Sequence, residues 1–199
     1  NVPADFADAV SYVSGRKQLS GKYEFMWTED SDHNMHKRVI IPCYWKGELI
    51  GSTSRTFIDG IKPKYYGDYE PNFVFNVNQQ RPDSKFVLVV EGPFDAMAID
   101  GVAVLSNECS EIQADIIDSL GREVIVVPDA DKAGANLVKR AIEYGWSVSF
   151  PVWQEECKDI NDAVMKMGRL ATLLSIVQAR KTTRLQIELA RKQLSRNFS

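Results

Sequence analysis

The stretch that decides the fold is residues 86–134. It opens with the apolar run FVLVV at residues 86–90, which ends on Glu91. A second run, EVIVV at residues 123–127, ends on PDADKAG at residues 128–134. Continuous β-branched runs of this length are typical of parallel strands that are buried on both faces. Because ligands collect beyond the carboxyl ends of such strands, both runs deliver acidic residues to the edge where chemistry is expected.

Three carboxylates follow the two runs: Glu91 after the first, and Asp129 and Asp131 after the second. One residue separates the two aspartates, so in an extended segment their side chains leave from the same face. Mg²⁺ prefers oxygen ligands and usually joins one or two protein carboxylates to substrate phosphates. These residues therefore predict a divalent-cation site. The alternative is that both aspartates cap the helix that begins near Lys132, where negative charge meets the positive helix end.

Strands and helices alternate through the second half of the chain, which is typical of an α/β domain with a mainly parallel sheet. Ser110 to Gln113 has the capping-box pattern of a helix start. Helices are expected at residues 94–100, 110–120 and 133–144, and strands at residues 86–90, 102–105, 123–127 and 146–150.

A further helix is expected to begin within KDIND, residues 158–162, and to end at Gly168. Asp159 follows the fourth strand at a distance that could return it to the carboxyl edge, so it is a candidate fourth metal ligand. Asp159 and Asp162 could instead cap the helix, and capping is the better interpretation for Asp162.

Residues 169–199 place leucines at helical intervals with Arg and Lys between them, which indicates a docked helix with a basic outer face. Contact of that face with nucleic acid or with a partner protein is the alternative.

The composition, with 44% hydrophobic residues in 199, is ordinary for a globular protein, but the net charge of −3 conceals a division along the chain. Residues 86–168 have 6 basic and 15 acidic side chains, whereas residues 169–199 have 7 and 1. An acidic centre that holds anionic phosphates needs bound cations to reverse its local field. The charge pattern therefore favours a metal site over direct capture of phosphate.

No run approaches the roughly 18 apolar residues of a membrane span, and no charged and then apolar leader opens the sequence. We therefore expect a cytoplasmic protein without membrane contact. The cysteines, Cys43, Cys109 and Cys157, form no Cys-x-x-Cys pair, which favours buried or idle thiols over a zinc or redox site.

The first part of the chain predicts a β-hairpin. Residues 38–45 and 48–57 are strand-like and flank the turn Lys46-Gly47, so Arg38 and Arg55 are expected near the open end of the hairpin.

The following loop, residues 59–67, is rich in cations and aromatic side chains, with Lys62, Lys64 and Tyr65 at its centre. Basic side chains neutralise phosphates and tyrosine rings support unpaired bases, so this composition suits a single-stranded template or a nucleotide. A solvated turn with two core tyrosines explains the same residues equally well.

Several of these motifs together resemble a Toprim domain, the fold shared by topoisomerases, primases and some nucleases. They are Glu91-Gly92 with Asp95-Ala96, the turn at residues 129–134 and the segment at residues 158–162. The upstream motifs resemble the subdomain that precedes Toprim in DnaG-type bacterial and phage primases. They are, in order, RVIIP at residues 38–42, Gly51 to Arg55, Pro63-Lys64-Tyr65 and Phe73-Val74-Phe75.

The resemblance spans roughly residues 5–168 and implies three parts: a basic primase subdomain of α+β type at residues 1–84, an α/β Toprim domain at 85–168 and C-terminal helices at 169–199. It also implies an activity, the Mg²⁺-dependent synthesis of short RNA primers from nucleoside triphosphates on single-stranded DNA. Such an enzyme would act in DNA replication, in the cytoplasm of a bacterium or of a phage-infected host cell.

The family's functional residues fall on matching positions of this sequence. Glu91, Asp129 and Asp131 would be catalytic, and together with Asp159 they would bind Mg²⁺ or Mn²⁺. The residues that would hold the template and the incoming nucleotide are Arg38, Arg55, Lys62, Lys64, Tyr65 and Lys132.

The sequence also departs from the family pattern. The bacterial family has a further lysine soon after its Phe-x-Phe strand, where this chain has Asn76-Val77-Asn78, so the resemblance does not carry that nucleotide contact over to this chain. Neither a cysteine-rich zinc module nor a helicase P-loop is present. We expect the zinc-binding module upstream in the full-length protein, with Asn1 marking a cut, and a replicative helicase as a partner.

Two other functions fit the same residues. A Toprim site can belong to a metal-dependent nuclease, although hydrolysis does not need the triphosphate-binding cations Arg38, Arg55 and Lys64. A non-catalytic module that binds nucleic acid or helicase through the basic tail is the other alternative, and the four acidic residues argue against it.

Overall fold

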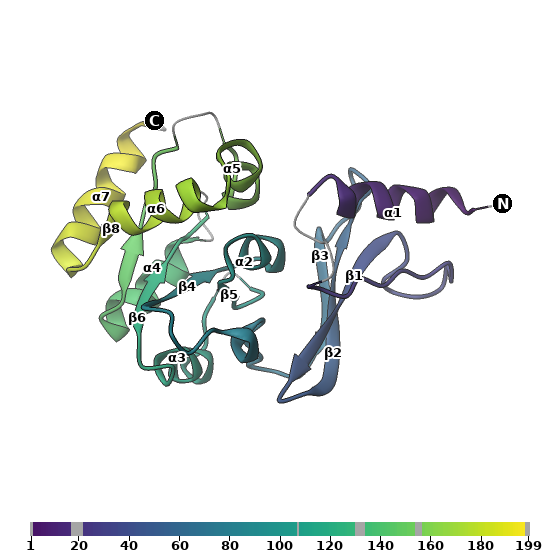
Figure 1. Cartoon of the computed structure of the whole chain (residues 1–199), viewed down its shortest axis with the longest axis horizontal. Coiled ribbons are helices and arrows are strands. Elements are labelled where there is room, and N and C mark those ends of the chain that lie inside the picture. Colours follow the sequence, from purple (N-terminus) through teal and green to yellow (C-terminus); the bar gives the residue numbers. More distant parts are fainter. Residues whose placement is uncertain (1, 17–21, 107, 130–133, 154–156, 198–199) are drawn as a thin grey trace. The chain divides into compact units, whose positions relative to one another are not determined.

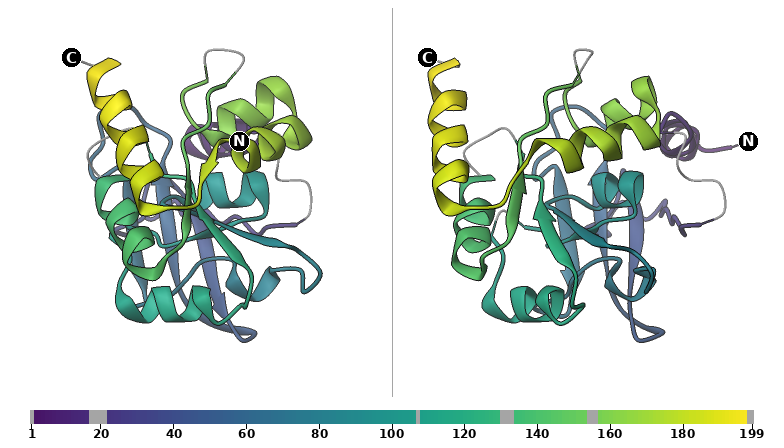
Figure 2. Two further views of the ribbon diagram at one scale, coloured as in Figure 1. Left: turned by 90° about the vertical axis from the view of Figure 1, so that its left-hand side faces the viewer. Right: turned by 60° about the vertical axis from the view of Figure 1, so that its left-hand side comes forward.

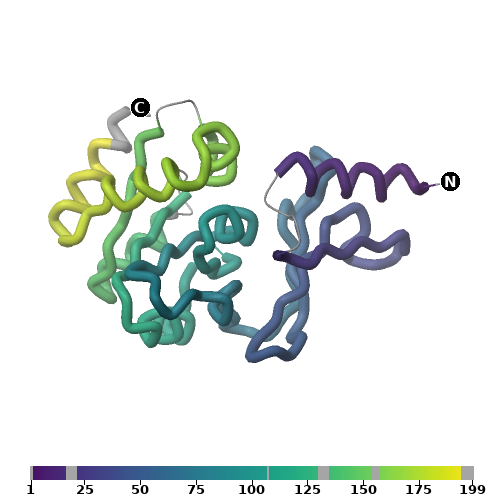
Figure 3. The backbone as a smooth tube through the Cα atoms, viewed as in Figure 1, coloured from purple at the N-terminus to yellow at the C-terminus, as the bar shows by residue number. Residues whose placement is uncertain are grey.

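The computed structural model describes the whole chain except residues 1, 17–21, 107, 130–133, 154–156 and 198–199 (Figure 1). The chain divides into two units, Asn1–Phe73 and Val74–Ser199. Figure 3 follows the backbone through both units, from the first helix in purple to the last in yellow. Within the described residues, no helix combines the length and the hydropathy needed to cross a bilayer.

The first unit is built on an antiparallel sheet of three strands in the order β1-β2-β3. Its elements are α1 (Ala4–Ser14), β1 (Arg38–Trp45), β2 (Glu48–Thr56) and β3 (Tyr65–Tyr69). The predicted hairpin is confirmed: Lys46 and Gly47 connect β1 to β2 with φ angles of 51° and 87°, as a tight turn between twisted strands requires.

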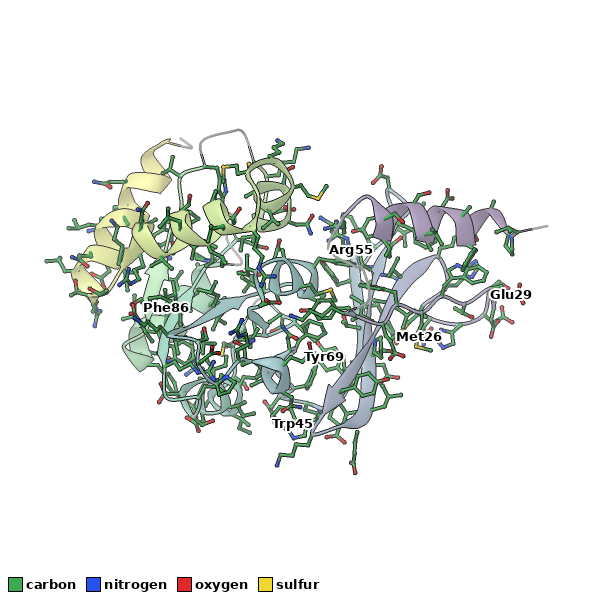
Figure 4. All side chains as sticks on the ribbon, viewed as in Figure 1. Met26, Glu29, Trp45, Arg55, Tyr69 and Phe86 are labelled. Atoms are coloured by element: carbon green, nitrogen blue, oxygen red, sulfur yellow. The ribbon has the colours of Figure 1, made fainter. Side chains whose placement is uncertain are left out.

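The sheet of the first unit is buried along β1, where Val39, Ile41 and Cys43 are almost inaccessible to solvent. Phe73 is buried at the end of this core that contains Trp45. The centroids of the two rings are 6.1 Å apart, in an edge-on arrangement. In Figure 4, Trp45 and Arg55 mark opposite ends of the sheet. The end with Arg55 is the end with the predicted cations.

The second unit is built on a five-stranded sheet in the order β5-β4-β6-β7-β8. Its strands are β4 (Phe86–Val90), β5 (Val102–Ala103), β6 (Glu123–Val126), β7 (Ser147–Ser149) and β8 (Arg180–Lys181). The first four are parallel, which confirms the predicted α/β class with a mainly parallel sheet. Strand β8 was not predicted; it pairs antiparallel with β7 at one edge of the sheet.

Helices cover both faces of this sheet, as the continuous apolar strands require (Figure 2). On one face lie α2 (Pro93–Ile99), α5 (Ile160–Met167) and α6 (Arg169–Ala179); on the other lie α3 (Glu111–Asp118) and α4 (Gly134–Tyr144). The short 3-10 helix η1 (Val77–Gln79) precedes β4, and α7 (Arg184–Asn197) packs beside β8.

Local sequence signals explain how several of these helices begin. Helix α3 starts with the predicted capping box, in which the Ser110 hydroxyl accepts the Gln113 N–H at 3.1 Å and the Gln113 side chain accepts the Ser110 N–H at 3.0 Å. Helix α2 starts with Pro93 at its first position, where the missing N–H costs no hydrogen bond. These signals fix the turns that follow β4 and precede α3.

Cys43 and Cys109 are fully buried, so their reactivity tests how tightly the core of each unit is packed. Burial raises the pKa of Cys43, in the first unit, to about 12 and that of Cys109, in the second, to about 11. Since the thiolate is the reactive form, we predict that iodoacetamide at about pH 8 labels Cys157 in the native chain and leaves Cys43 and Cys109 unmodified. Mass spectrometry reads the sites, and labelling in urea provides the control. Native labelling of Cys43 as fast as that of Cys157 would contradict this packing.

Candidate active site

The candidate site lies where two neighbouring parallel strands, β4 and β6, reach their carboxyl ends. Their pairing runs from Phe86 opposite Glu123 to Val89 opposite Val126. The chain leaves β4 toward β5 on one side of this pair and leaves β6 toward β7 on the other. The strand order therefore reverses between β4 and β6, and at such a switch point α/β sheets bind their ligands.

Glu91 and Asp129 stand at equivalent positions of this switch point. Near the carboxyl ends of the two strands, the Val127 N–H donates to the Val89 carbonyl at 2.9 Å, and each acidic residue follows two positions later. Glu91 is half-buried, with its Oε1 atom shielded from solvent, whereas Asp129 is exposed. The sequence prediction that both strands deliver carboxylates to the same edge is thus realised in the topology.

Hydrogen bonds fix the backbone at Glu91 and at the residue that follows it. Its carbonyl accepts the Leu105 N–H at 3.0 Å, which ties it to the segment after β5. The next residue, Gly92, is the N-cap of α2, and its carbonyl accepts the Ala96 N–H at 3.2 Å. The position of the glutamate is therefore set by a strand, a helix and a neighbouring loop.

Asp159 is the N-cap residue of α5. Its Oδ1 accepts the Asp162 N–H at 2.7 Å. The Asp162 carboxylate in turn accepts the Lys158 N–H at 3.1 Å and lies 3.2 Å from the ammonium of Lys166. These contacts lower the pKa of Asp162, with the Lys158 N–H as the main cause. Both aspartates thus stabilise the start of the helix, and the exposed carboxylate of Asp159 also remains a candidate ligand.

Asp95 connects α5 to the Glu91 turn. It lies in the first turn of α2, four residues after Glu91, and its Oδ1 accepts the backbone N–H of Asn161 at 3.0 Å. This bond fastens the N-terminus of α5 to the N-terminus of α2. It places the turn that contains Asp159 against the helix that begins beside Glu91. The contact spans 66 positions, so no local sequence signal identifies it.

Glu91 and Asp129 at this edge, and Asp159 at the start of α5, all offer carboxylate oxygens, which are the ligands that a hard divalent cation prefers. In the part of the chain that the structure describes, no three His, Cys, Asp or Glu side chains lie together in a group that could hold a metal ion. Asp131 and Lys132, which the sequence also nominates, lie outside the described residues. The edge itself therefore offers two carboxylates of the right chemical type, Glu91 and Asp129.

The predicted nucleotide-binding residues of the first unit fall on two faces of its sheet. Arg55 pairs with Val39 across β1–β2 and with Tyr65 across β2–β3, so these three side chains share one face. The Arg55 guanidinium lies over the Tyr65 ring, 4.7 Å from its centroid. Among the described residues, the Nε of Arg55 has no hydrogen-bond acceptor. This stacked pair offers both a cation and an aromatic ring.

Arg38 belongs to the other face, because it pairs with Thr56, one residue beyond Arg55. It is only 4% exposed, and its guanidinium donates to the Pro63 carbonyl at 2.7 Å and to the Lys64 carbonyl at 3.3 Å. Burial lowers the pKa of Arg38 from its usual value. Lys62 and Lys64 themselves are exposed. In the structure Arg55 therefore stacks on Tyr65. Arg38 is instead hydrogen-bonded to the backbone of the lysine-containing segment, residues 62–64.

Comparisons with known proteins agree with this arrangement. A protein-family model described as Toprim-like matches residues 88–164, which include the end of β4, all of β6 and the start of α5. A DNA primase from Aquifex aeolicus is 24% identical over 152 residues, which is 67% of this chain. The chain spans only 30% of the length of that primase.

Solved structures match most of the chain. The RNA polymerase domain of the Mycobacterium tuberculosis primase DnaG is similar with a TM-score of 0.69 and 18% identity, over 90% of this chain and 78% of that one. A DnaG primase catalytic domain bound to single-stranded DNA gives 0.65 and 20%, over 89% and 73%. Residues 88–164 thus form a Toprim-like domain, and the chain has the fold of the DnaG primase catalytic core.

Proposed function

We propose that this chain is the catalytic core of a DNA primase, which makes short RNA primers from nucleoside triphosphates on a single-stranded DNA template. The observation that carries the proposal is the placement of Glu91 and Asp129 at the switch point of a Toprim-like sheet. A Toprim-like site alone is compatible with several metal-dependent phosphoryl-transfer reactions. Among these reactions, the primase-core fold favours primer synthesis.

In the proposed reaction the 3′-hydroxyl of one nucleotide attacks the α-phosphate of the next, and pyrophosphate leaves. Glu91, Asp129 and Asp159, with Asp131 nominated by the sequence, would hold Mg²⁺ or Mn²⁺. When bound, this cation lowers the pKa of the attacking hydroxyl and neutralises charge on the phosphate oxygens. The half-buried carboxylate of Glu91 is the group placed to accept the hydroxyl proton or to assist the cation.

The charge of the Toprim-like region explains why a cation is needed. Residues 86–168 have 15 acidic and 6 basic side chains, so a triphosphate would be repelled from this surface in the absence of bound metal. The carboxylates would then have two effects. They would bind the cation, and they would make nucleotide binding depend on that cation.

The first unit supplies the proposed template and nucleotide contacts. Arg55 stacked on Tyr65 offers a cation with an aromatic face, and the exposed Lys62 and Lys64 follow in the same loop. Stacking and phosphate neutralisation are the two interactions by which proteins hold single strands. Lys132 is proposed for the nucleotide from its sequence position alone.

The wider assignments rest on the primase resemblance. We propose the three functional parts at residues 1–84, 85–168 and 169–199, a zinc-binding module upstream in the full-length protein, and a replicative helicase as partner. The proposed setting is DNA replication in the cytoplasm of a bacterium or of a phage-infected cell.

The first prediction concerns the Asp129 carboxylate. Asp129→Ala lowers primer synthesis by on the order of a hundredfold or more, because it removes a metal ligand without disturbing the core. The assay combines labelled nucleoside triphosphates, single-stranded DNA and Mg²⁺ or Mn²⁺. Glu188→Gln, a change on α7 outside the proposed site, serves as the control and retains activity. Undiminished synthesis by Asp129→Ala, or shortening of the DNA instead of primer formation by the wild-type chain, would refute the assignment.

The second prediction separates Asp95 from the metal ligands. Asp95→Asn keeps an oxygen that can accept the Asn161 N–H, whereas Asp95→Ala removes it. We predict that Asp95→Ala weakens Mn²⁺ binding about ten- to a hundredfold, as loss of a group that orients ligands does, and that Asp95→Asn stays near wild type. Calorimetry measures the affinity, with Asp129→Asn as the variant that loses a ligand. Equal losses for Asp95→Asn and Asp95→Ala would instead make Asp95 a ligand.

A further inference from the structure

Arg38 has an arrangement that a phosphate-binding cation would not need. Its side chain is 4% exposed, and its guanidinium donates Nη2–H to the Pro63 carbonyl at 2.7 Å and Nη1–H to the Lys64 carbonyl at 3.3 Å. A planar guanidinium can bridge two consecutive carbonyls, whereas the single ammonium of a lysine is a point charge on a flexible stem. The arginine is thus matched to the backbone of the lysine-containing segment.

The same segment is fastened by Thr56, which pairs with Arg38 in the sheet. The Thr56 N–H donates to the Lys64 carbonyl at 3.1 Å, so that oxygen accepts from both residues. The Thr56 hydroxyl accepts the Ile58 N–H at 3.1 Å at the other end of the loop. The loop between β2 and β3 is therefore closed at its base by the pair Arg38 and Thr56.

The strand register keeps Arg38 away from the stacked pair Arg55 and Tyr65. Arg38 and Thr56 share one face of the sheet, and Arg55 and Tyr65 share the other. The Arg38 side chain is only 4% exposed and two of its N–H groups already donate to backbone carbonyls, so little of the guanidinium is accessible to a phosphate in solution. Direct contact with the same ligand is therefore unfavourable.

We propose that Arg38 is a positioning residue: it holds the backbone at Pro63 and Lys64 so that the exposed Lys64 ammonium is presented to single-stranded DNA. This inference rests on the proposed function, since it assumes that the loop binds the template. The ligand contact belongs to Lys64, and Arg38 acts only through it.

A double-mutant cycle tests this role with fluorescence anisotropy of a labelled oligothymidine. Lys64→Met and Arg38→Met are each expected to weaken binding about five- to tenfold, and the double variant should be within about twofold of Lys64→Met alone, because coupled residues are not additive. Arg38→Lys should be as weak as Arg38→Met, because it keeps the charge but not the two-carbonyl bridge.

Salt dependence and a stability control complete the experiment. The slope of log affinity against log salt should fall by about 0.7 in Lys64→Met, as for one lost phosphate contact, and should not fall further when Arg38→Met is added. Ile41→Val, a core change in the same sheet, destabilises the unit without touching the loop and should leave DNA affinity unchanged.

Three results would overturn the inference: additive losses in the cycle, a wild-type affinity in Arg38→Lys, or an equal loss in Ile41→Val. The first two would make Arg38 a direct phosphate contact, and the third would reduce its effect to general stability. Failure of the wild-type chain to bind the oligothymidine has a different meaning. It would remove the proposed template site itself, and with it the basis for this role of Arg38.

Discussion

The parallel pairing of β4 with β6 is the constraint on which the rest of the structure depends. Both strands are buried, so their backbone groups must pair with each other, and the register aligns their ends. Once Val127 has donated to the Val89 carbonyl, Glu91 and Asp129 necessarily emerge at one edge. The reversal of strand order at this pair leaves that edge uncovered by a crossover helix. Apolar burial thus determines where the acidic residues lie.

In both units, a charged side chain forms hydrogen bonds to the backbone of a distant segment. In the second unit, Asp95 accepts the Asn161 N–H and so brings the turn with Asp159 to the helix that begins beside Glu91. In the first unit, Arg38 donates to two successive carbonyls below the exposed Lys64. In each case one ionised group is partly or fully buried and hydrogen-bonded, while a neighbouring group of the same sign is exposed for ligand. A change in the buried group is therefore expected to act on the proposed site through the backbone and not through contact with a ligand.

Sequence patterns predicted what depends on local chemistry. The apolar runs located β4 and β6 and hence Glu91 and Asp129, the Lys46-Gly47 turn located the hairpin, and Ser110 with Gln113 located the start of α3. What the sequence patterns did not predict depends on distant partners. The two-residue strand β8 exists only because β7 offers an edge, and the face of Arg38 follows from a register that the sequence does not state. Likewise, Asp159 and Asp162 both stabilise the start of α5, as capping predicts, but the hydrogen bond from Asn161 to Asp95 that links this helix to α2 crosses 66 positions.

The central claim is that the carboxylates at the β4–β6 edge bind a divalent cation. Anomalous scattering from crystals soaked in Mn²⁺ tests it most directly, because the signal locates the ion without reference to activity. The account predicts an ion in direct contact, at about 2.2 Å, with the carboxylates of Glu91 and Asp129. An ordered Mn²⁺ bound only elsewhere on the chain, with this edge metal-free at saturating concentration, would contradict it.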